Sequence, residues 1–149
     1  MMALARWLRT LLLPAVLLLP SAAAQAQAQA APTPGCEDFL AVLGDKPDAI
    51  EYLGCRQEWG QGKPLVARYR LDGADAAGVE RYLRQRFGLE PLHFRCCGWD
   101  APPHSWRDPR TGHEYMIAFG SEETLVSSRA QWGRIDNFHI RVERYTEDI

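Results

Sequence analysis

Four cysteines carry the most reactive side chains of this 149-residue chain, and their spacing limits the chemistry they could do. They are Cys36, Cys55, Cys96 and Cys97. An even number of cysteines in an exported chain is typical of two disulfides. No Cys-x-x-Cys pair is present, as a thioredoxin-like redox motif or a zinc site would need. We therefore predict that all four are structural and that none is a catalytic nucleophile.

The pairing of the cysteines is predicted from the periodicity around them. Cys36 is in phase with the apolar residues of a short predicted helix, which places it on the buried side. Successive residues of a strand point to opposite faces, so Cys96 and Cys97 are expected to have different partners. We predict the pairs Cys36–Cys96 and Cys55–Cys97.

Histidines and carboxylates near residue 110 raise the alternative of a metal site. His104, Asp108, His113 and Glu114 offer nitrogen and oxygen ligands, but their spacing matches no known ligand motif. Gly-x-Ser-x-Gly, a phosphate-binding glycine loop and His-Glu-x-x-His are also absent from the sequence. We predict a protein that is not an enzyme and that binds neither metal nor any other cofactor.

The segment 99–113 is predicted to be a long loop that contacts another molecule. Loops of this length without regular structure tend to be functional or disordered. Trp and Arg often dominate binding energy, and the prolines here lower the cost of ordering a loop. The alternative is that Trp99 and Trp106 fold back as a lid on the core. The candidate contact residues are Trp99, His104, Trp106, Arg107, Asp108 and Arg110.

The N-terminus has the three parts of a cleavable secretory signal. Arg6 and Arg9 precede an apolar run from Leu11 to Leu19, and small residues follow, with Ala-x-Ala cleavage choices between Ala24 and Ala28. A membrane span needs roughly 20 apolar residues, about twice the length of this run. We therefore predict a periplasmic protein without a membrane span after cleavage.

Three consecutive parts are expected: a signal peptide over 1–28, a flexible tether over 29–35 and one domain over 36–149. The formal net charge is −2, and the arginines are scattered along the chain. Nucleic acids and anionic membranes reward clustered Lys and Arg instead. The composition therefore favours a protein partner and argues against nucleic acid.

Apolar periodicity predicts an α+β domain: an antiparallel sheet of about five strands with two to three helices packed on one face, stapled by disulfides. The strands occur in hairpin pairs rather than in regular βαβ units. The predicted strands cover 50–59, 65–71, 91–99, 113–120 and 138–145, and the predicted helices 36–43, 74–87 and 121–135.

Several of these segments together resemble a family of small exported proteobacterial proteins of unassigned function. The resemblance covers Cys36 to Ile149. It is carried by Cys-Cys-Gly-Trp at 96–99, Tyr-x-Ile at 115–117, Ser121-x-Glu123-Thr124-Leu125-Val126-x-x-Arg129-x-x-Trp132 and Tyr145-x-x-Asp148-Ile149. Small periplasmic proteins of this type include immunity proteins against toxins of the type VI secretion system. The resemblance implies such a role and supplies no catalytic residues.

Taken together, these features predict a periplasmic binding or inhibitor protein, an immunity protein that neutralises a secreted toxin by direct contact. One alternative is an envelope-maintenance protein without catalytic activity. The other is a small periplasmic hydrolase or metal-dependent enzyme that uses His and Asp or Glu from the 99–113 segment.

Overall fold

A computed structural model describes residues 35–147, which belong to one unit of the chain, Ala31–Ile149. The predicted signal peptide, nearly all of the predicted tether and the last two residues lie outside the described residues. Within 35–147, no helix is both long and apolar enough to cross a membrane.

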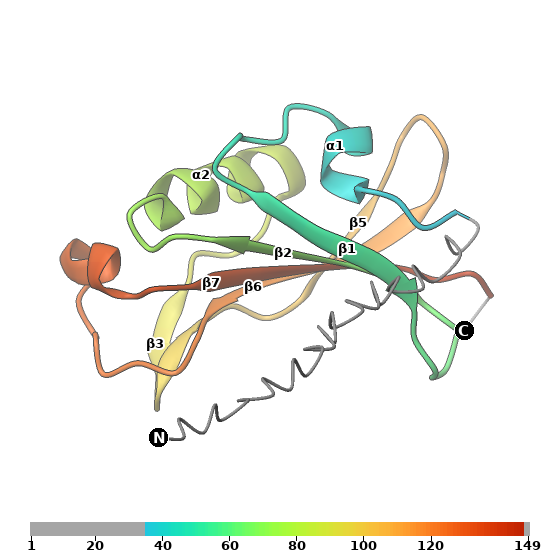
Figure 1. Ribbon diagram of the computed structural model, residues 1–149. Helices are drawn as coiled ribbons and strands as arrows, with labels where there is room; N and C mark the ends of the chain where they lie inside the picture. Colours follow the sequence, from blue (N-terminus) through green and yellow to red (C-terminus); the bar gives the residue numbers. More distant parts are fainter. Residues whose placement is uncertain (1–34, 148–149) are drawn as a thin grey trace, which may run out of the picture. The chain divides into compact units, whose positions relative to one another are not determined.

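An antiparallel sheet of seven strands forms the framework (Figure 1). The strand order is β1-β2-β7-β6-β4-β3, and β5 pairs separately with β6. The strands are β1 (Glu51–Gln57), β2 (Leu65–Leu71), β3 (His93–Arg95), β4 (Gly98–Asp100), β5 (His104–Arg107), β6 (Glu114–Ser121) and β7 (Phe138–Arg144). The helical segments are α1 (Phe39–Leu43), α2 (Ala76–Phe87) and the 3-10 helix η1 (Arg129–Arg134).

Helices α1 and α2 cover one face of the sheet, as Figure 1 shows. Alternate residues of the central strands point into the core between the sheet and these helices, so Tyr69, Ile117 and Ile140 are buried. Their neighbours Arg68 and Arg141 pair across β2 and β7 and point to the other face. This two-layer arrangement confirms the predicted helices on one face of an antiparallel sheet.

The number of strands was predicted wrongly, because two segments form more structure than expected. The predicted strand 91–99 is a hairpin of β3 and β4, in which Arg95 pairs with Gly98. The predicted loop 99–113 contains the end of β4 and all of β5, whose residues pair with β6. The sheet therefore has seven short strands, and its share of the fold is larger than in the predicted α+β arrangement.

The predicted disulfide pairs are also wrong. The bonds are Cys36–Cys55, with Cα atoms 5.4 Å apart, and Cys96–Cys97, between adjacent residues. Cys96 and Cys97 form the two-residue turn between β3 and β4, so strand alternation does not apply to them. Cys96 has a φ of +49°, the left-handed conformation that tight hairpin turns require.

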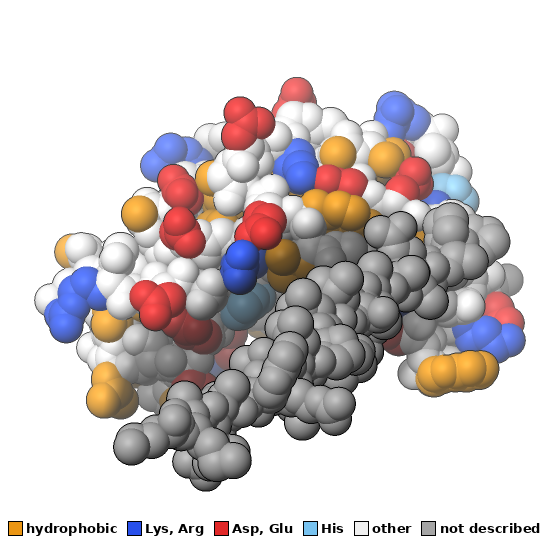
Figure 2. Space-filling view, viewed as in Figure 1, with side chains coloured by type: hydrophobic (Ala, Val, Ile, Leu, Met, Phe, Trp, Pro, Cys, Tyr) orange, Lys and Arg blue, Asp and Glu red, His pale blue; other side chains and the backbone are white. Residues whose placement is uncertain are grey.

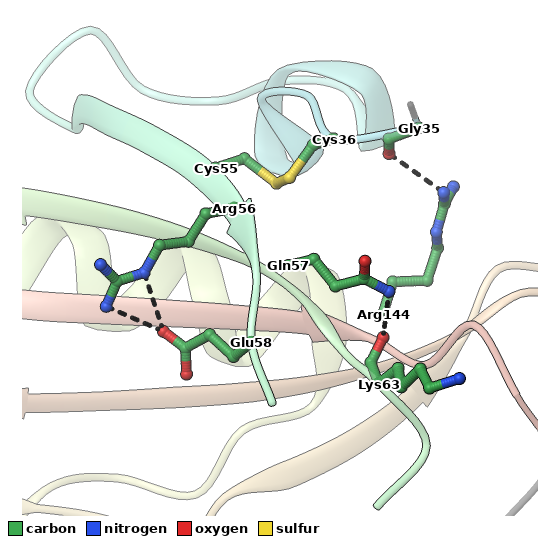
Figure 3. Close-up of a disulfide and its surroundings, with 8 residues drawn as sticks. All are labelled: Gly35, Cys36, Cys55, Arg56, Gln57, Glu58, Lys63 and Arg144. Carbon is green, nitrogen blue, oxygen red and sulfur yellow. Dashed lines mark hydrogen bonds and ion pairs between the residues drawn. A yellow bond between two sulfur atoms is a disulfide. The ribbon is translucent and has the colours of Figure 1, made fainter. Parts of the chain in front are cut away.

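The Cys36–Cys55 bond fastens the segment before α1 to the edge strand β1 (Figure 3). Arg144 of β7 donates a hydrogen bond to the Gly35 carbonyl at 3.0 Å, which adds a second attachment next to the bond. The Leu40 amide donates to the buried Tyr69 hydroxyl at 3.1 Å. Because α1 has only five residues, these contacts rather than helix propensity hold it in place.

Helix α2 begins after Asp75 and ends at Phe87, and its C-cap Gly88 has a φ of +85°, the left-handed conformation that glycine adopts at little cost. Its apolar residues Val79, Leu83 and Phe87 face the sheet. Glu80 lies on the same buried side, and it is one of two charged residues buried among those described.

Candidate functional site

The six predicted contact residues do not form one exposed loop. Trp99 is only 6 % exposed; its indole Nε1 donates to the Val126 carbonyl at 2.7 Å, and its ring packs against Trp132 at 5.0 Å. Trp106 is half-buried and packs edge-on against Phe87 at 5.1 Å. Both tryptophans therefore fold back on the core, which was the alternative interpretation of this segment.

Asp108 is buried and organises the turn between β5 and β6. Its carboxylate accepts hydrogen bonds from the Arg110 amide at 2.9 Å and the Thr111 hydroxyl at 3.0 Å. The amide hydrogen bond is the main cause that lowers the pKa of Asp108 below its usual range. The role of this side chain is to shape the turn, because carboxylates commonly cap such turns through neighbouring amides.

The remaining three predicted contact residues lie in β5 or in the turn between β5 and β6, and they differ in how exposed they are. Arg107 is exposed and pairs with Glu114 at 3.0 Å. Arg110 is exposed, and its guanidinium donates to the Val42 carbonyl at 3.4 Å. His104 is half-buried next to Gly88. Among residues 35–147, no group of three His, Cys, Asp or Glu side chains could hold a metal ion.

The motifs at 96–99 and 121–132 meet in space and build a different surface. The tip of the β3–β4 hairpin lies against the segment that follows β6, with a hollow of about 260 Å³ between them. We call the exposed side chains of Cys96, Cys97, Glu123 and Leu125 the Cys96–Leu125 surface. Hydrophobic atoms are visible at the surface of the segment between β6 and η1, at the lower left of Figure 2.

Hydrogen bonds on both sides of Leu125 hold its backbone in place. The Thr124 amide donates to the Cys97 carbonyl at 2.7 Å. The Val126 carbonyl accepts from the Trp99 indole, as described above, and Val126 packs against the core. The Leu125 side chain is nevertheless 94 % exposed. It is a large apolar group presented to solvent by an ordered backbone.

A partly buried ion pair between Glu80 and Arg129 supports this segment. Arg129 donates to both carboxylate oxygens of Glu80, at 2.7 and 3.0 Å, and the Leu92 amide donates to the same carboxylate at 2.6 Å. The Arg129 guanidinium also lies over the rings of Trp99 and Trp132, at 5.4 and 4.6 Å from the centroids. This network joins α2, the start of β3 and η1.

Two opposing effects set the pKa of Glu80. Burial raises it, because a charged carboxylate loses hydration, but the hydrogen bonds from Arg129 and the Leu92 amide outweigh burial and lower the pKa below its usual range. Glu80 is therefore ionised at neutral pH and serves to fix Arg129.

A second large apolar side chain is exposed at the opposite end of the sheet. Trp59 follows β1 and is 96 % exposed, and hydrophobic atoms protrude at this hairpin tip at the lower right of Figure 2. The neighbouring Glu58 pairs with Arg68 at 2.5 Å and with Arg141 at 2.7 Å. The hydrogen bond from Arg68 is the main cause that lowers the pKa of Glu58 to about 2.

Sequence reasoning missed Leu125 as a surface residue because it assigned 121–135 to one helix. A helical stripe through Leu125, Arg129 and Trp132 placed all three on one side, yet only Trp132 is buried. The helical part covers Arg129–Arg134 alone. The adjacent cysteines were the available signal for the β3–β4 turn against which this segment packs, since a disulfide between neighbouring residues indicates a turn rather than a strand.

Comparison with known proteins gives a family but no activity. No curated protein and no solved structure is significantly similar to this chain. A domain of unknown function, DUF4952, matches residues 24–99, which is slightly more than half of the chain. Among the described elements, the match runs from α1 to Trp99 in β4 and includes both disulfides. The chain therefore belongs to the DUF4952 family of domains of unknown function.

Proposed function

We propose that this protein is a non-enzymatic binding protein that contacts a protein partner through the Cys96–Leu125 surface. The observation that carries the proposal is Leu125, which is 94 % exposed on a backbone held by hydrogen bonds on both sides. Burying a leucine side chain contributes about 1.5–3 kcal/mol. A partner with an apolar pocket gains this energy at little ordering cost, since the backbone of Leu125 is already in place.

The surroundings of Leu125 match the anatomy of a small interface. The apolar centre is bordered by the exposed carboxylate of Glu123 and by the ion pair of Arg95 and Asp100, which are 3.4 Å apart. Interfaces typically combine an apolar centre with a polar rim that remains hydrated. Acidic and basic side chains are interleaved over the face shown in Figure 2. This mixed charge favours a protein partner over a polyanion.

The carboxyl groups with lowered pKa values support a binding function rather than catalysis. Glu58, Glu80 and Asp108 have lowered pKa values, and each is engaged with an arginine or a backbone amide that fixes local structure. A general acid or base would need a pKa near the working pH. These three groups are therefore placed to hold the fold, which leaves the two most exposed large apolar side chains among the described residues, Leu125 and Trp59, as features without a structural role.

The more specific form of the proposal is a periplasmic immunity protein that neutralises a secreted toxin. It is supported by the predicted signal peptide, by the disulfides and by the resemblance to small exported proteins that include such immunity proteins. Leu125 would then enter an apolar pocket on the toxin. A partner that is a structural component of the envelope would instead point to envelope maintenance.

Site-specific photo-crosslinking tests the surface in producing cells. A benzoyl-phenylalanine residue at position 125 should crosslink one defined protein, which mass spectrometry identifies. The same probe at the exposed Glu90, in the connection after α2, is the matched control and should not capture that protein. The identified partner is then purified, and its Kd is measured by titration.

The variant Leu125→Asp should weaken this binding by at least about 2 kcal/mol, roughly 30-fold in Kd. Val42→Asp, which alters a half-exposed side chain on α1, should leave the Kd unchanged. An unchanged Kd for Leu125→Asp would remove the Cys96–Leu125 surface from the interface. A loss for Trp59→Ala instead would move the contact to the β1–β2 hairpin. A loss for Arg107→Ala and Arg110→Ala would move it to the segment originally predicted.

A further inference from the structure

The bond between Cys96 and Cys97 lies where a redox partner can reach it. The two residues form the tip of the β3–β4 hairpin, and both side chains are exposed. Each strand of this hairpin has only three residues, so the tip projects from a short support. By contrast, Cys36 and Cys55 are only partly exposed, and they join the segment before α1 to β1.

The same bond contributes little to the stability of the fold. A disulfide stabilises mainly by closing a loop in the unfolded chain, and the effect grows with loop length. The Cys96–Cys97 bond joins residues one position apart, whereas Cys36–Cys55 spans 19 positions. The Trp99 and Arg129 contacts described above hold this end of the molecule without the bond. Opening Cys96–Cys97 therefore leaves the rest of the domain folded.

We propose that Cys96–Cys97 is a reversible redox site, reduced in the folded protein by a dithiol and re-formed by a disulfide oxidant. A thiolate of the dithiol attacks one sulfur atom, the Cys96–Cys97 bond breaks, and the other cysteine leaves as a thiolate that takes up a proton. The second thiol of the reductant then attacks the mixed disulfide. The reductant ends as a disulfide, and two electrons and two protons have passed to Cys96 and Cys97.

Reduction changes the backbone on which Leu125 depends. Cys96 has a positive φ, which non-glycine residues seldom adopt, and the bond to Cys97 restricts the turn to this conformation. The Cys97 carbonyl accepts the hydrogen bond from the Thr124 amide. Once the bond is open, the turn can relax and this hydrogen bond weakens. Reduction thus loosens the Cys96–Leu125 surface, and the regulatory meaning of that effect rests on the proposed binding function.

A dithiol titration tests the redox site. The protein with both bonds formed is equilibrated with reduced and oxidised dithiothreitol at a series of ratios, free thiols are trapped with N-ethylmaleimide, and the labelled peptides are assigned by mass spectrometry. Cys96 and Cys97 should be labelled at a reductant ratio at least about tenfold below that for Cys36 and Cys55, with unchanged circular dichroism. Phenylarsine oxide, which bridges neighbouring thiols, should bind once to each reduced molecule.

Labelling of all four cysteines together, or only as the circular dichroism signal is lost, would overturn the redox site. The variant Cys36→Ala with Cys55→Ala keeps the test independent of the first bond. In this variant, provided that it is folded, Cys96 and Cys97 should titrate at the same ratio as before. A shift of the midpoint to the ratio at which the fold is lost would count against the proposal.

Amide hydrogen exchange tests the coupling to Leu125. Exchange at the Thr124 amide should accelerate at least about fivefold on reduction, and likewise in the variant Cys96→Ser with Cys97→Ser. The Thr146 amide, which bonds to the Gly62 carbonyl at the other end of the sheet, is the control and should not change. Unchanged exchange at Thr124 would overturn the coupling. A reducible bond together with an unaffected Kd for Leu125→Asp would leave the redox site standing and remove the proposed function.

Discussion

The two disulfides lie in two regions of the domain that are stabilised in different ways. Cys36–Cys55 closes a loop between residues 19 positions apart and attaches α1 to an edge strand. Cys96–Cys97 closes only the small ring between two adjacent residues, and the structure around it depends on Glu80, Arg129 and Trp99. The first bond adds to the core packing of Phe39, Leu40 and Leu43, because a helix of five residues has little stability of its own. The second bond is exposed, and the surrounding structure does not depend on it, because the Glu80–Arg129 ion pair and the Trp99–Trp132 ring contact stabilise that region.

The largest effect is expected from removing the first bond. Cys36→Ala combined with Cys55→Ala should lower the free energy of unfolding by about 3 kcal/mol, because the unfolded chain regains the freedom of the closed loop. Urea denaturation followed by circular dichroism measures this change. A loss below about 1 kcal/mol would show that the Arg144 and Tyr69 contacts hold α1 without the bond.

The next largest effect should come from the ion pair at the other end. Glu80→Ala removes the partner of Arg129 and leaves the Leu92 amide unsatisfied, for an expected loss of about 2 kcal/mol. The value lies below that of a fully buried pair because the Arg129 side chain is 44 % exposed. The same urea experiment applies, with Glu90→Ala on the surface as the matched control. Equal stability of the two variants would contradict a supporting role for the ion pair.

Removing the second bond should have a smaller effect. Cys96→Ala with Cys97→Ala should cost less than about 1 kcal/mol, since the bond joins adjacent residues and releases no long loop in the unfolded chain. Replacing Cys96 by Gly instead of Ala should recover part of any loss, because glycine adopts the positive φ of this turn readily. Thermal unfolding of the two double variants side by side measures the difference. A loss of stability equal to that of the Cys36→Ala, Cys55→Ala variant would show that the two bonds stabilise the fold equally and would contradict this prediction.

The smallest expected effect is a pH dependence at the β1–β2 hairpin. The pKa of Glu58 is about 2 in the folded protein and 4.5 in its ordinary state, so its ion pairs stabilise the fold above pH 4.5. This contribution is lost as the pH falls from 4.5 towards 2 and Glu58 becomes protonated. Glu58→Gln should flatten the decline of Tm over that window, whereas Glu51→Gln, at the start of the preceding strand β1, is the control. An identical decline in the two variants would contradict this assignment.

Regular periodicity predicted several elements well. The second strand covers 65–71 as expected, the long helix ends at Phe87 and the last strand begins at Phe138. In each case the apolar residues recur with the period of a strand or a helix and so mark one buried face, which is a local property of the sequence. The segments between them were harder, because β3, β4 and β5 have three or four residues each and contain too few positions for a periodic signal.

The candidate site was mostly beyond sequence reasoning. Trp99 and Trp106 carried the predicted contacts, but the structure uses both to cover the core. Leu125 gave no sign of its exposure, because a leucine in an apolar pattern is equally consistent with the core. Its position follows from hydrogen bonds to the β3–β4 hairpin, which is distant in sequence.

By itself, the amino-acid sequence determined an antiparallel sheet with helices on one face, together with four cysteines available for two bonds. Both follow from residue types and from spacings of a few positions. Only the tertiary structure decided which cysteines pair and which apolar side chain remains in solvent. Those outcomes depend on contacts between segments far apart in the chain, such as Arg129 with Glu80 and Thr124 with Cys97, and short-range periodicity contains no information about them.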